Sequence, residues 1–197
     1  MPVHRPLILA SRSPRRRAML ADIGFVFDSC DPDIEETPRA GEAGADFALR
    51  MARDKARAAA ARYPEAVVLA ADTDVELDGR MLGKPRDRDD ALAMLAALSA
   101  RSHRVHSAVA AAADGGAPEI VQTITTIHFS EIAPRDAEAY WASGDPADKA
   151  GAYAIQGYAA RWVRSVEGSV SAVIGLPLVE AIELLARFDV HPGVPQL

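Results

Sequence analysis

The sequence predicts an α/β protein with a mixed sheet flanked by helices. Segments whose apolar residues recur with helical spacing are interspersed with short apolar or alternating segments typical of strands. Two pairs of strand-like segments are joined at Asp78-Gly79 and Asp114-Gly115, which are strong signals for β-hairpins and hence for antiparallel pairing. The pattern has no regular β-α-β alternation, which argues against a doubly wound parallel sheet.

The first strand and the first helix are marked by the turn between them. Residues 7–11 form a short apolar run that predicts a buried strand. Ser13 suits an N-cap and Pro14 suits the first position of a helix, so we expect the helix to begin there. Gly24 is a natural C-terminal stop for this helix.

The remaining elements follow from periodicity and breaker residues. Residues 46–62 predict a long helix, because Phe47 and Met51 begin an apolar stripe and Pro64 follows the segment. Residues 66–71 are apolar throughout, as in a buried strand. The other expected segments are, in chain order, a strand at 25–30, a loop at 31–44, a hairpin at 75–82, a helix at 89–98, long strands at 104–113 and 119–132, a helix at 134–143, a polar segment at 145–158, a hairpin at 161–174 and a final helix at 177–188.

Composition limits the classes of protein to consider. The chain has 197 residues, 49% of them hydrophobic and 25% charged, as in an ordinary folded domain. We expect a single domain over residues 1–190 and a flexible tail over 191–197, where two prolines and a glycine occur. The net charge of −6 argues against a nucleic-acid partner, because nucleic-acid binding requires a basic face.

The cysteine content and the apolar runs predict a cytoplasmic protein without a membrane partner. Cys30 is the single cysteine, so no intrachain disulfide can form, as is usual in a reducing compartment. We interpret it as a small core residue, in preference to a nucleophile. No apolar run is long enough to span a bilayer, and the N-terminal arginines follow the apolar run, the wrong order for a secretory signal.

The first candidate site is the segment S-R-S-P-R-R at residues 11–16. It places unpaired backbone N–H groups at a helix N-terminus, next to guanidinium groups that bind phosphate oxygens well. One interpretation is a solvated basic first turn. We favour a bound polyanion, because the helix dipole disfavours cations at this end unless something compensates them.

The second candidate site is Asp72-Thr73-Asp74, directly after the apolar run 66–71. Carboxylates at the carboxyl end of a buried strand are expected to face a cleft. Two carboxylates together with phosphate oxygens suit a magnesium ion. The alternative is a pair of turn residues at the start of a hairpin.

The chain uses lysine at only three positions, Lys55, Lys84 and Lys149, which suggests a specific need for a compact charge there. Lys55 continues the apolar stripe of its helix. Taken alone, this position favours a side chain that snorkels, with its ammonium group at the rim of the helix–sheet interface. The alternative is a side chain that extends into a cleft. Lys84 follows a glycine, but Pro85 occupies the place of the Ser or Thr that a P-loop requires, so we reject a P-loop.

His103 and His106 have a metal-like spacing, but they lie in a predicted strand. A separation of three residues there puts them on opposite faces, which argues against a zinc site.

Eight short stretches occur together in a characteristic order: L-A-S-R-S-P-R-R-R (9–17), I-E-E (34–36), A-R-D-K-A-R (52–57), A-A-D-T (70–73), G-K-P-R-D (83–87), L-S-A-R-S-H-R-V (98–105), D-K-A-G-A-Y-A-I-Q-G (148–157) and G-L-P-L (175–178). In this combination the chain resembles the Maf family of nucleoside triphosphate pyrophosphatases. The resemblance implies an elongated mixed sheet with two lobes around a central cleft, as in ITPase-like proteins. It also implies hydrolysis of nucleoside triphosphates to monophosphate and pyrophosphate.

The resemblance assigns roles residue by residue. Asp72 would be the general base and, with Glu36, would hold a divalent cation, Mg²⁺ or Mn²⁺. The residues expected around the substrate are Ser11, Arg15, Arg16, Lys55, Thr73, Lys84 and Gln156. The Arg16, Thr73 and Gln156 pattern resembles the subgroup that acts on dTTP and UTP, and an amide can pair with a pyrimidine edge. A homodimer is expected from the resemblance alone.

Four positions depart from the family pattern. Asp74 stands where an apolar residue is usual, Ala100 where a glycine is usual, and Ser107-Ala108 where Thr-Gly is usual. An alternative function is a nucleotide-binding regulator of cell division with little catalysis, since the family name derives from a septum-formation phenotype.

Overall fold

A computed structural model of the chain describes residues 5–193. Its framework is one mixed sheet of seven strands in the order β2-β1-β3-β5-β6-β7, with β4 paired to β3. The β1–β2 and β1–β3 pairs are parallel and the other pairs are antiparallel, as the mixed class predicted. The strands are β1 (Leu7–Ala10), β2 (Asp28–Cys30), β3 (Val67–Leu77), β4 (Arg80–Leu82), β5 (Ser102–Ala112), β6 (Glu119–Phe129) and β7 (Val163–Glu167).

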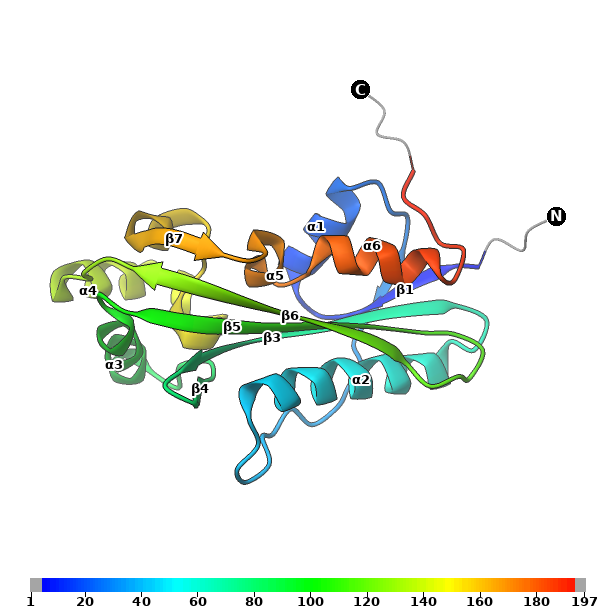
Figure 1. Ribbon diagram of the computed structural model, residues 1–197, viewed down its shortest axis with the longest axis horizontal. Coiled ribbons are helices and arrows are strands. Elements are labelled where there is room, and N and C mark those ends of the chain that lie inside the picture. Colours follow the sequence, from blue (N-terminus) through cyan, green and yellow to red (C-terminus); the bar gives the residue numbers. More distant parts are fainter. Residues whose placement is uncertain (1–4, 194–197) are drawn as a thin grey trace.

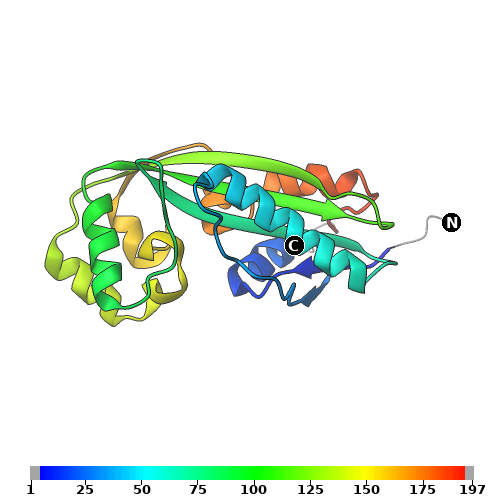
Figure 2. The ribbon, with the colours of Figure 1, turned by 90° about the horizontal axis from the view of Figure 1, so that it is seen from below.

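Helices cover both faces of this sheet. In Figure 1, α2 runs along one face, whereas α1 and α6 lie on the other. The α-helices are α1 (Pro14–Asp22), α2 (Gly44–Arg62), α3 (Arg88–Leu98), α4 (Pro134–Ala142), α5 (Val170–Ile174) and α6 (Leu178–Ala186). Three 3-10 helices, η1 (Asp145–Asp148), η2 (Ala150–Ala152) and η3 (Gly157–Trp162), follow α4. Figure 2 shows two lobes: α3, α4 and the 3-10 helices form one, and β1, α1 and α2 belong to the other.

Strand β3 joins the two lobes and has a free stretch along one edge. On that edge, β1 pairs with Val67–Leu69 and β4 pairs with Val75–Leu77. The opposite edge pairs continuously with β5 from Val68 to Glu76. Asp72 to Asp74 therefore lie on the part of this edge between β1 and β4, where no strand within residues 5–193 pairs with β3.

The continuous pairing with β5 corrects the prediction for this strand. We expected a strand at 66–71 with Asp72 and Asp74 at its carboxyl end, but the strand continues to Leu77 and the carboxylates are in its middle. The predicted turn at Asp78-Gly79 is confirmed, since β3 and β4 pair antiparallel across it.

The predicted hairpin at 161–174 is wrong. Strand β7 pairs with β6 instead, and the Ser169 side chain accepts from the Ala172 N–H as the N-cap of α5. Gly168 turns the chain at φ +126°, where an added Cβ would lie 3.1 Å from Cα of Thr125. The strand expected at 25–30 is shorter, only Asp28–Cys30. The predicted helices at 46–62, 89–98, 134–143 and 177–188 are confirmed within two residues or so of their ends.

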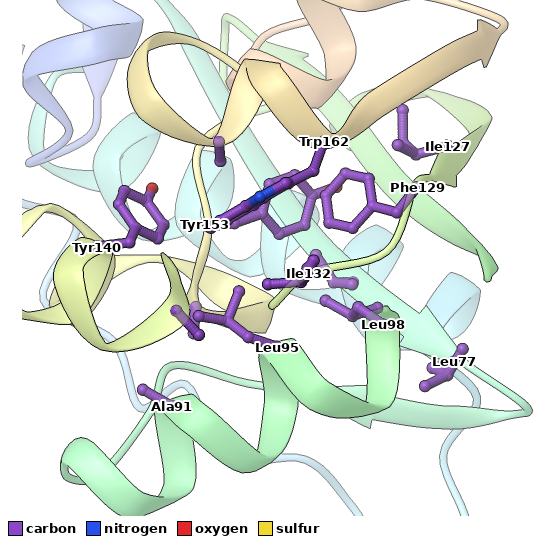
Figure 3. Close-up of a cluster of buried hydrophobic side chains, with 14 of the residues drawn as sticks. Leu77, Ala91, Leu95, Leu98, Ile127, Phe129, Ile132, Tyr140, Tyr153 and Trp162 are labelled. Carbon is purple, nitrogen blue, oxygen red and sulfur yellow. The ribbon is translucent and has the colours of Figure 1, made fainter. Parts of the chain in front are cut away.

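The core beneath α2 differs in composition from the core of the other lobe. Beneath α2, alanines from the helix pack on alanines of β3 and β5: Ala48, Ala52, Ala56, Ala59, Ala70, Ala108, Ala110 and Ala112. In the other lobe the core is built from large side chains, and Figure 3 shows its aromatic members Phe129, Tyr140, Tyr153 and Trp162 gathered between α3 and α4 and the chain that follows them.

The chain beyond α6 returns to the first helix. The Gly193 N–H donates to the Gly24 carbonyl at 2.8 Å. Residues 194–197, the rest of the predicted flexible tail, lie outside the described residues, and both the tail and the single domain over 1–190 stay predictions. Ala100 has a left-handed backbone with φ 55°, which explains why glycine is expected at this position.

Candidate active site

A cavity of about 860 Å³ lies beside the free edge of β3. All nine residues that the sequence singled out for the substrate and the metal line it: Ser11, Arg15, Arg16, Glu36, Lys55, Asp72, Thr73, Lys84 and Gln156. One wall, here called the charged wall, comes from residues 11–16, Glu36, Lys55 and residues 72–73. The facing wall, called the 3-10 wall, comes from residues 148–156. The predicted central cleft is thus present, and the motifs that predicted it converge on it.

The centre of the charged wall is a buried ion pair between Lys55 and Asp72. Lys55 Nζ lies 2.6 Å from Asp72 Oδ1 and 3.0 Å from Glu36 Oε2. Lys55 and Asp72 are only 4% and 6% exposed. Such a pair is costly to bury and very costly to break, so it indicates a functional constraint rather than simple stabilisation.

The interpretation of Lys55 as a snorkelling side chain is therefore wrong. The alanines beneath α2 hold the helix against the sheet, and the apolar stripe that carries Lys55 faces β3 rather than the rim. At position 72 the strand carries a carboxylate, whereas the strand residues before it, 67–71, are apolar. Lys55 therefore forms an ion pair with Asp72 in the protein interior.

Two polar groups from distant parts of the chain hold the Arg16 side chain. Its Nε donates to the Gly175 carbonyl at 2.7 Å, and its Nη2 donates to Thr73 Oγ1 at 3.3 Å. The Ser107 hydroxyl lies 3.3 Å from Thr73 Oγ1 and donates to the Ala172 carbonyl at 2.7 Å. Burial lowers the pKa of Arg16, while the charges of Asp72 and Glu36 oppose that shift. Thr73, expected at the substrate, thus also orients Arg16.

The β1–α1 turn is built as the sequence predicted. Ser13 caps α1 and accepts from the Arg16 N–H at 3.4 Å, and Ser11 Oγ accepts from the Ser13 N–H at 3.1 Å. Arg15 reaches across the cavity to Asp148, with 3.5 Å between Nη1 and Oδ2. The helix N-terminus and its arginines therefore line the cavity together, as polyanion binding requires.

Asp74 follows the Asp72 carboxylate along the same face of β3. Burial, then the negative charge of Asp72 and a hydrogen bond to it, raise the pKa of Asp74 to about 9. Its Oδ2 has no hydrogen-bond partner among residues 5–193. This extra acid therefore holds its proton more tightly than an ordinary carboxyl group.

The 3-10 wall carries the third lysine. Lys149 is 8% exposed and lies 3.0 Å from Asp145 Oδ1 and 2.8 Å from Asp148 Oδ1. Lys84 and Gln156 line the cavity from exposed positions. The Gly151 N–H donates to the Gly83 carbonyl at 3.1 Å, which joins this wall to the loop of Lys84. All three lysines therefore border one cavity.

The two histidines of β5 have separate partners. His103 Nε2 lies 2.7 Å from the Tyr153 hydroxyl, and His106 Nε2 lies 3.0 Å from Glu76 Oε2. The two rings thus bind different groups. Cys30 is free and buried, as a core residue.

Asp72 and Glu36 form a donor set that suits a divalent cation. Both carboxylates approach Lys55 Nζ, so they lie close enough together to share one cation. Mg²⁺ in proteins often uses one or two carboxylates and completes its coordination with phosphates and water. Within residues 5–193, no group of three or more His, Cys, Asp or Glu side chains is arranged to hold a metal by itself. The residues fit a cation that arrives with an anionic substrate.

Residues 6–188 match the family model described as Maf-like protein. The chain belongs to the Maf family. It is 46% identical over 192 residues to a dTTP/UTP pyrophosphatase of Hahella chejuensis, covering 96% of this chain and 95% of that protein. It is 49% identical over 181 residues to a dTTP/UTP pyrophosphatase of Myxococcus xanthus, covering 92% and 91%. These comparisons confirm the resemblance carried by the eight stretches.

Among solved structures, one similar chain is a nucleoside-triphosphatase, dITP/XTP pyrophosphatase, from Mycobacterium abscessus. The TM-score is 0.43 and the identity is 23%, over 64% of this chain and 74% of that one. As for membranes, none of the helices in residues 5–193 combines the length and the apolar character that a bilayer span requires.

The sequence missed two buried hydroxyls that support the site, those of Ser107 and Tyr140. Ser107 appeared only as a departure from the family pattern, and Tyr140 lay unremarked in the predicted helix at 134–143. Ser107 binds a carbonyl 65 residues away, and Tyr140 binds groups in the irregular segment that follows its helix, so periodicity gives no signal for either contact.

Proposed function

We propose that this protein hydrolyses nucleoside triphosphates to nucleoside monophosphate and pyrophosphate, with dTTP and UTP as preferred substrates. The observation that carries the proposal is the convergence of Asp72, Lys55 and Arg16 on one cavity whose opposite wall holds Gln156. The names of its relatives, dTTP/UTP pyrophosphatase, support the same reaction.

Asp72 is proposed as the general base. It accepts a proton from a water molecule as the water oxygen attacks the α-phosphorus, and the bond from that phosphorus to the bridging oxygen breaks as pyrophosphate leaves. Lys55 Nζ donates to Asp72 Oδ1 at 2.6 Å and holds the carboxylate in place beside the cavity.

Positive groups on the charged wall and the nearby loop hold the phosphates. Arg15, Arg16 and Lys84 offer fixed charge to the triphosphate and to the leaving pyrophosphate, and the α1 N-terminus adds backbone N–H groups. A Mg²⁺ or Mn²⁺ ion, when held by Asp72 and Glu36, would neutralise phosphate charge.

The 3-10 wall is proposed to contact the base. Gln156 both donates and accepts hydrogen bonds, as the edge of a thymine or uracil requires. Thr73 contributes by orienting Arg16 beside the phosphates. The homodimer and the cytoplasmic location stay predictions.

The decisive experiment measures pyrophosphate release from a panel of nucleoside triphosphates, with Mg²⁺, with Mn²⁺ and with chelator. We expect metal-dependent release that is fastest with dTTP and UTP. Nucleotide binding without release from any member of the panel would overturn the proposal and support the regulator instead. Release at an undiminished rate in chelator would overturn the metal requirement alone.

A further inference from the structure

Tyr140 lies outside the cavity but controls the backbone of the 3-10 wall. It projects from α4 into the aromatic core (Figure 3) and is fully buried. Its ring lies 5.5 Å from that of Trp162, nearly perpendicular to it, and stacks on Tyr158 at 5.4 Å. With its ring held on two sides, the hydroxyl occupies a fixed position.

That hydroxyl closes the segment that forms the wall. It accepts from the Ala154 N–H at 3.0 Å and donates to Asp145 Oδ2 at 2.9 Å. Asp145 begins η1 and Ala154 follows η2, so one side chain ties together the two ends of the segment 145–154. Burial raises the pKa of Tyr140, which keeps the hydroxyl able to donate at physiological pH.

The segment between these two contacts needs such a tie, because its backbone is irregular. Gly151 and Ala152 have φ values of 68° and 58°, in the left-handed region. An added Cβ at Gly151 would lie 3.1 to 3.2 Å from atoms of the Val75 side chain, so the segment also packs closely on β3. Removal of the tie would leave the Ala154 N–H without this acceptor, in a partly buried position beside the cavity.

The tie reaches the cavity at both ends. At one end, the tied Ala154 is itself among the residues 153–156 that line the cavity. At the other end, Asp145 also contacts Lys149 Nζ at 3.0 Å, and Lys149 lines the cavity as well. Among the described residues, no hydrogen bond or ion pair joins Tyr140 to Arg16, Lys55 or Asp72. The hydroxyl therefore contacts only the segment of the 3-10 wall directly. Within this part of the chain it is connected to Arg15 of the charged wall only through the successive contacts of Asp145, Lys149 and Asp148.

We propose that Tyr140, through its hydrogen bonds to Ala154 and Asp145, is a positioning residue that sets the selectivity of the cavity for the nucleotide base. The inference rests on the proposed function, in which the 3-10 wall contacts the base. It adds a specificity determinant that does not touch the substrate.

The test compares Tyr140→Phe with the parent protein on UTP and CTP. These nucleotides carry identical triphosphates and differ only at the base edge, so their ratio of kcat/KM reports on the 3-10 wall. We expect the KM for UTP to rise by about 10-fold with kcat within about 2-fold, and the UTP preference to fall by a similar factor. Tyr158→Phe is the matched control, since Tyr158 stacks on Tyr140 but its hydroxyl bonds to Arg161; it should behave as the parent.

A loss of folded protein alone would lower kcat for UTP and CTP equally, and that result, or an unchanged preference, would overturn the inference. If Tyr140→Phe does not fold, Asp145→Ala is tested in its place, because it removes the acceptor of the Tyr140 hydroxyl. This variant should also prefer UTP over CTP less strongly than the parent. An unchanged preference in Asp145→Ala would overturn the inference.

A binding measurement separates this inference from the proposed reaction. Thermal stabilisation by UMP should be lost in Tyr140→Phe, whereas stabilisation by pyrophosphate should remain. Equal loss of both, retention of both, or a parent that UMP does not stabilise would overturn the inference. A parent that releases no pyrophosphate from any triphosphate overturns the proposed function, and the UMP comparison still decides the role of Tyr140.

Discussion

The core under α2 and the core of the aromatic lobe are packed with side chains of opposite size. Under α2, alanine methyl groups from helix and sheet meet directly, so the helix backbone lies close to β3 and Lys55 reaches Asp72 at 2.6 Å. At the other end of the sheet, short helices and 3-10 turns leave wide gaps that Phe129, Tyr153 and Trp162 fill. Under α2, close packing of small side chains brings the charged groups of a helix and a strand into contact. In the aromatic lobe, large rings hold a buried hydroxyl, that of Tyr140, which in turn fixes a segment of irregular backbone.

The largest effect should come from removing the base on the closely packed side. Asp72→Asn keeps the size of the side chain but cannot accept the proton from water, so we expect kcat to fall by about 10³-fold or more. Steady-state pyrophosphate release measures it, and circular dichroism should show an unchanged fold. Asp54→Asn, on α2 outside the cavity, is the control and should retain the parental rate. Parental turnover by Asp72→Asn would exclude Asp72 as the base.

A smaller effect is expected where charge is kept and only geometry is lost. Arg16→Lys retains a cation but cannot contact both the Gly175 carbonyl and Thr73, so kcat/KM should fall by about 100-fold. Arg17→Lys, in the same helix but outside the cavity lining, should be neutral. Parental activity in Arg16→Lys would contradict this prediction, because it would show that a positive charge alone is enough at position 16.

The contrast in packing itself can be tested with one variant in each lobe. Ala52→Leu inserts bulk between α2 and the sheet, three residues before Lys55, and should cost about 1 to 3 kcal/mol of unfolding free energy and about 10-fold in kcat/KM. Leu95→Ala opens a cavity in the aromatic lobe and should cost about 2 to 3 kcal/mol with kcat nearly unchanged. Denaturant titration and kinetics on the folded protein measure both. Equal activity losses would show that the two packings do not differ in function.

The smallest effect is a pH dependence confined to the aromatic lobe. Burial, with a minor contribution from His128, lowers the pKa of His103 to about 4. In the unfolded chain, with a pKa of about 6.5, this histidine binds a proton that the folded protein excludes, so stability falls as the pH drops from about 6.5 towards 4. His103→Gln should reduce the loss of unfolding free energy between about pH 7 and pH 5.5 by about 1 kcal/mol. An identical pH profile in variant and parent would contradict this assignment.

The sequence predicted correctly those features of the fold that depend on neighbouring residues, such as helix starts and tight turns. Ser13-Pro14 marked the start of α1, and the dipeptide Asp78-Gly79 marked a turn between paired strands. The residues of the cavity were found because short motifs preserve their order along the chain. Lys55 was misjudged from its helix alone, because its partner lies in a strand that only the tertiary fold brings opposite it.

The same limit applies to the middle of β3 and to the hydroxyl groups. Asp72 and Asp74 looked like the end of a strand because polar residues usually follow a buried one, and only the pairing with β5 extends the strand past them. Tyr140 carries no pattern of its own, since the backbone groups it binds lie in a segment without regular structure. Periodicity in the sequence therefore cannot predict hydrogen bonds between a side chain and a segment of irregular backbone.

The ladder between β3 and β5 has a consequence for how the cavity can admit a nucleotide. This ladder runs without a break from Val68 to Glu76 and therefore crosses from one lobe to the other. A hinge rotation that swung the lobes apart would have to rupture those hydrogen bonds, whereas a gentle twist of the sheet would not. Substrate entry and product departure are thus left to the loop around Glu36 and to the 3-10 turns, so turnover should follow the motion of these surface segments while the sheet between them stays stiff.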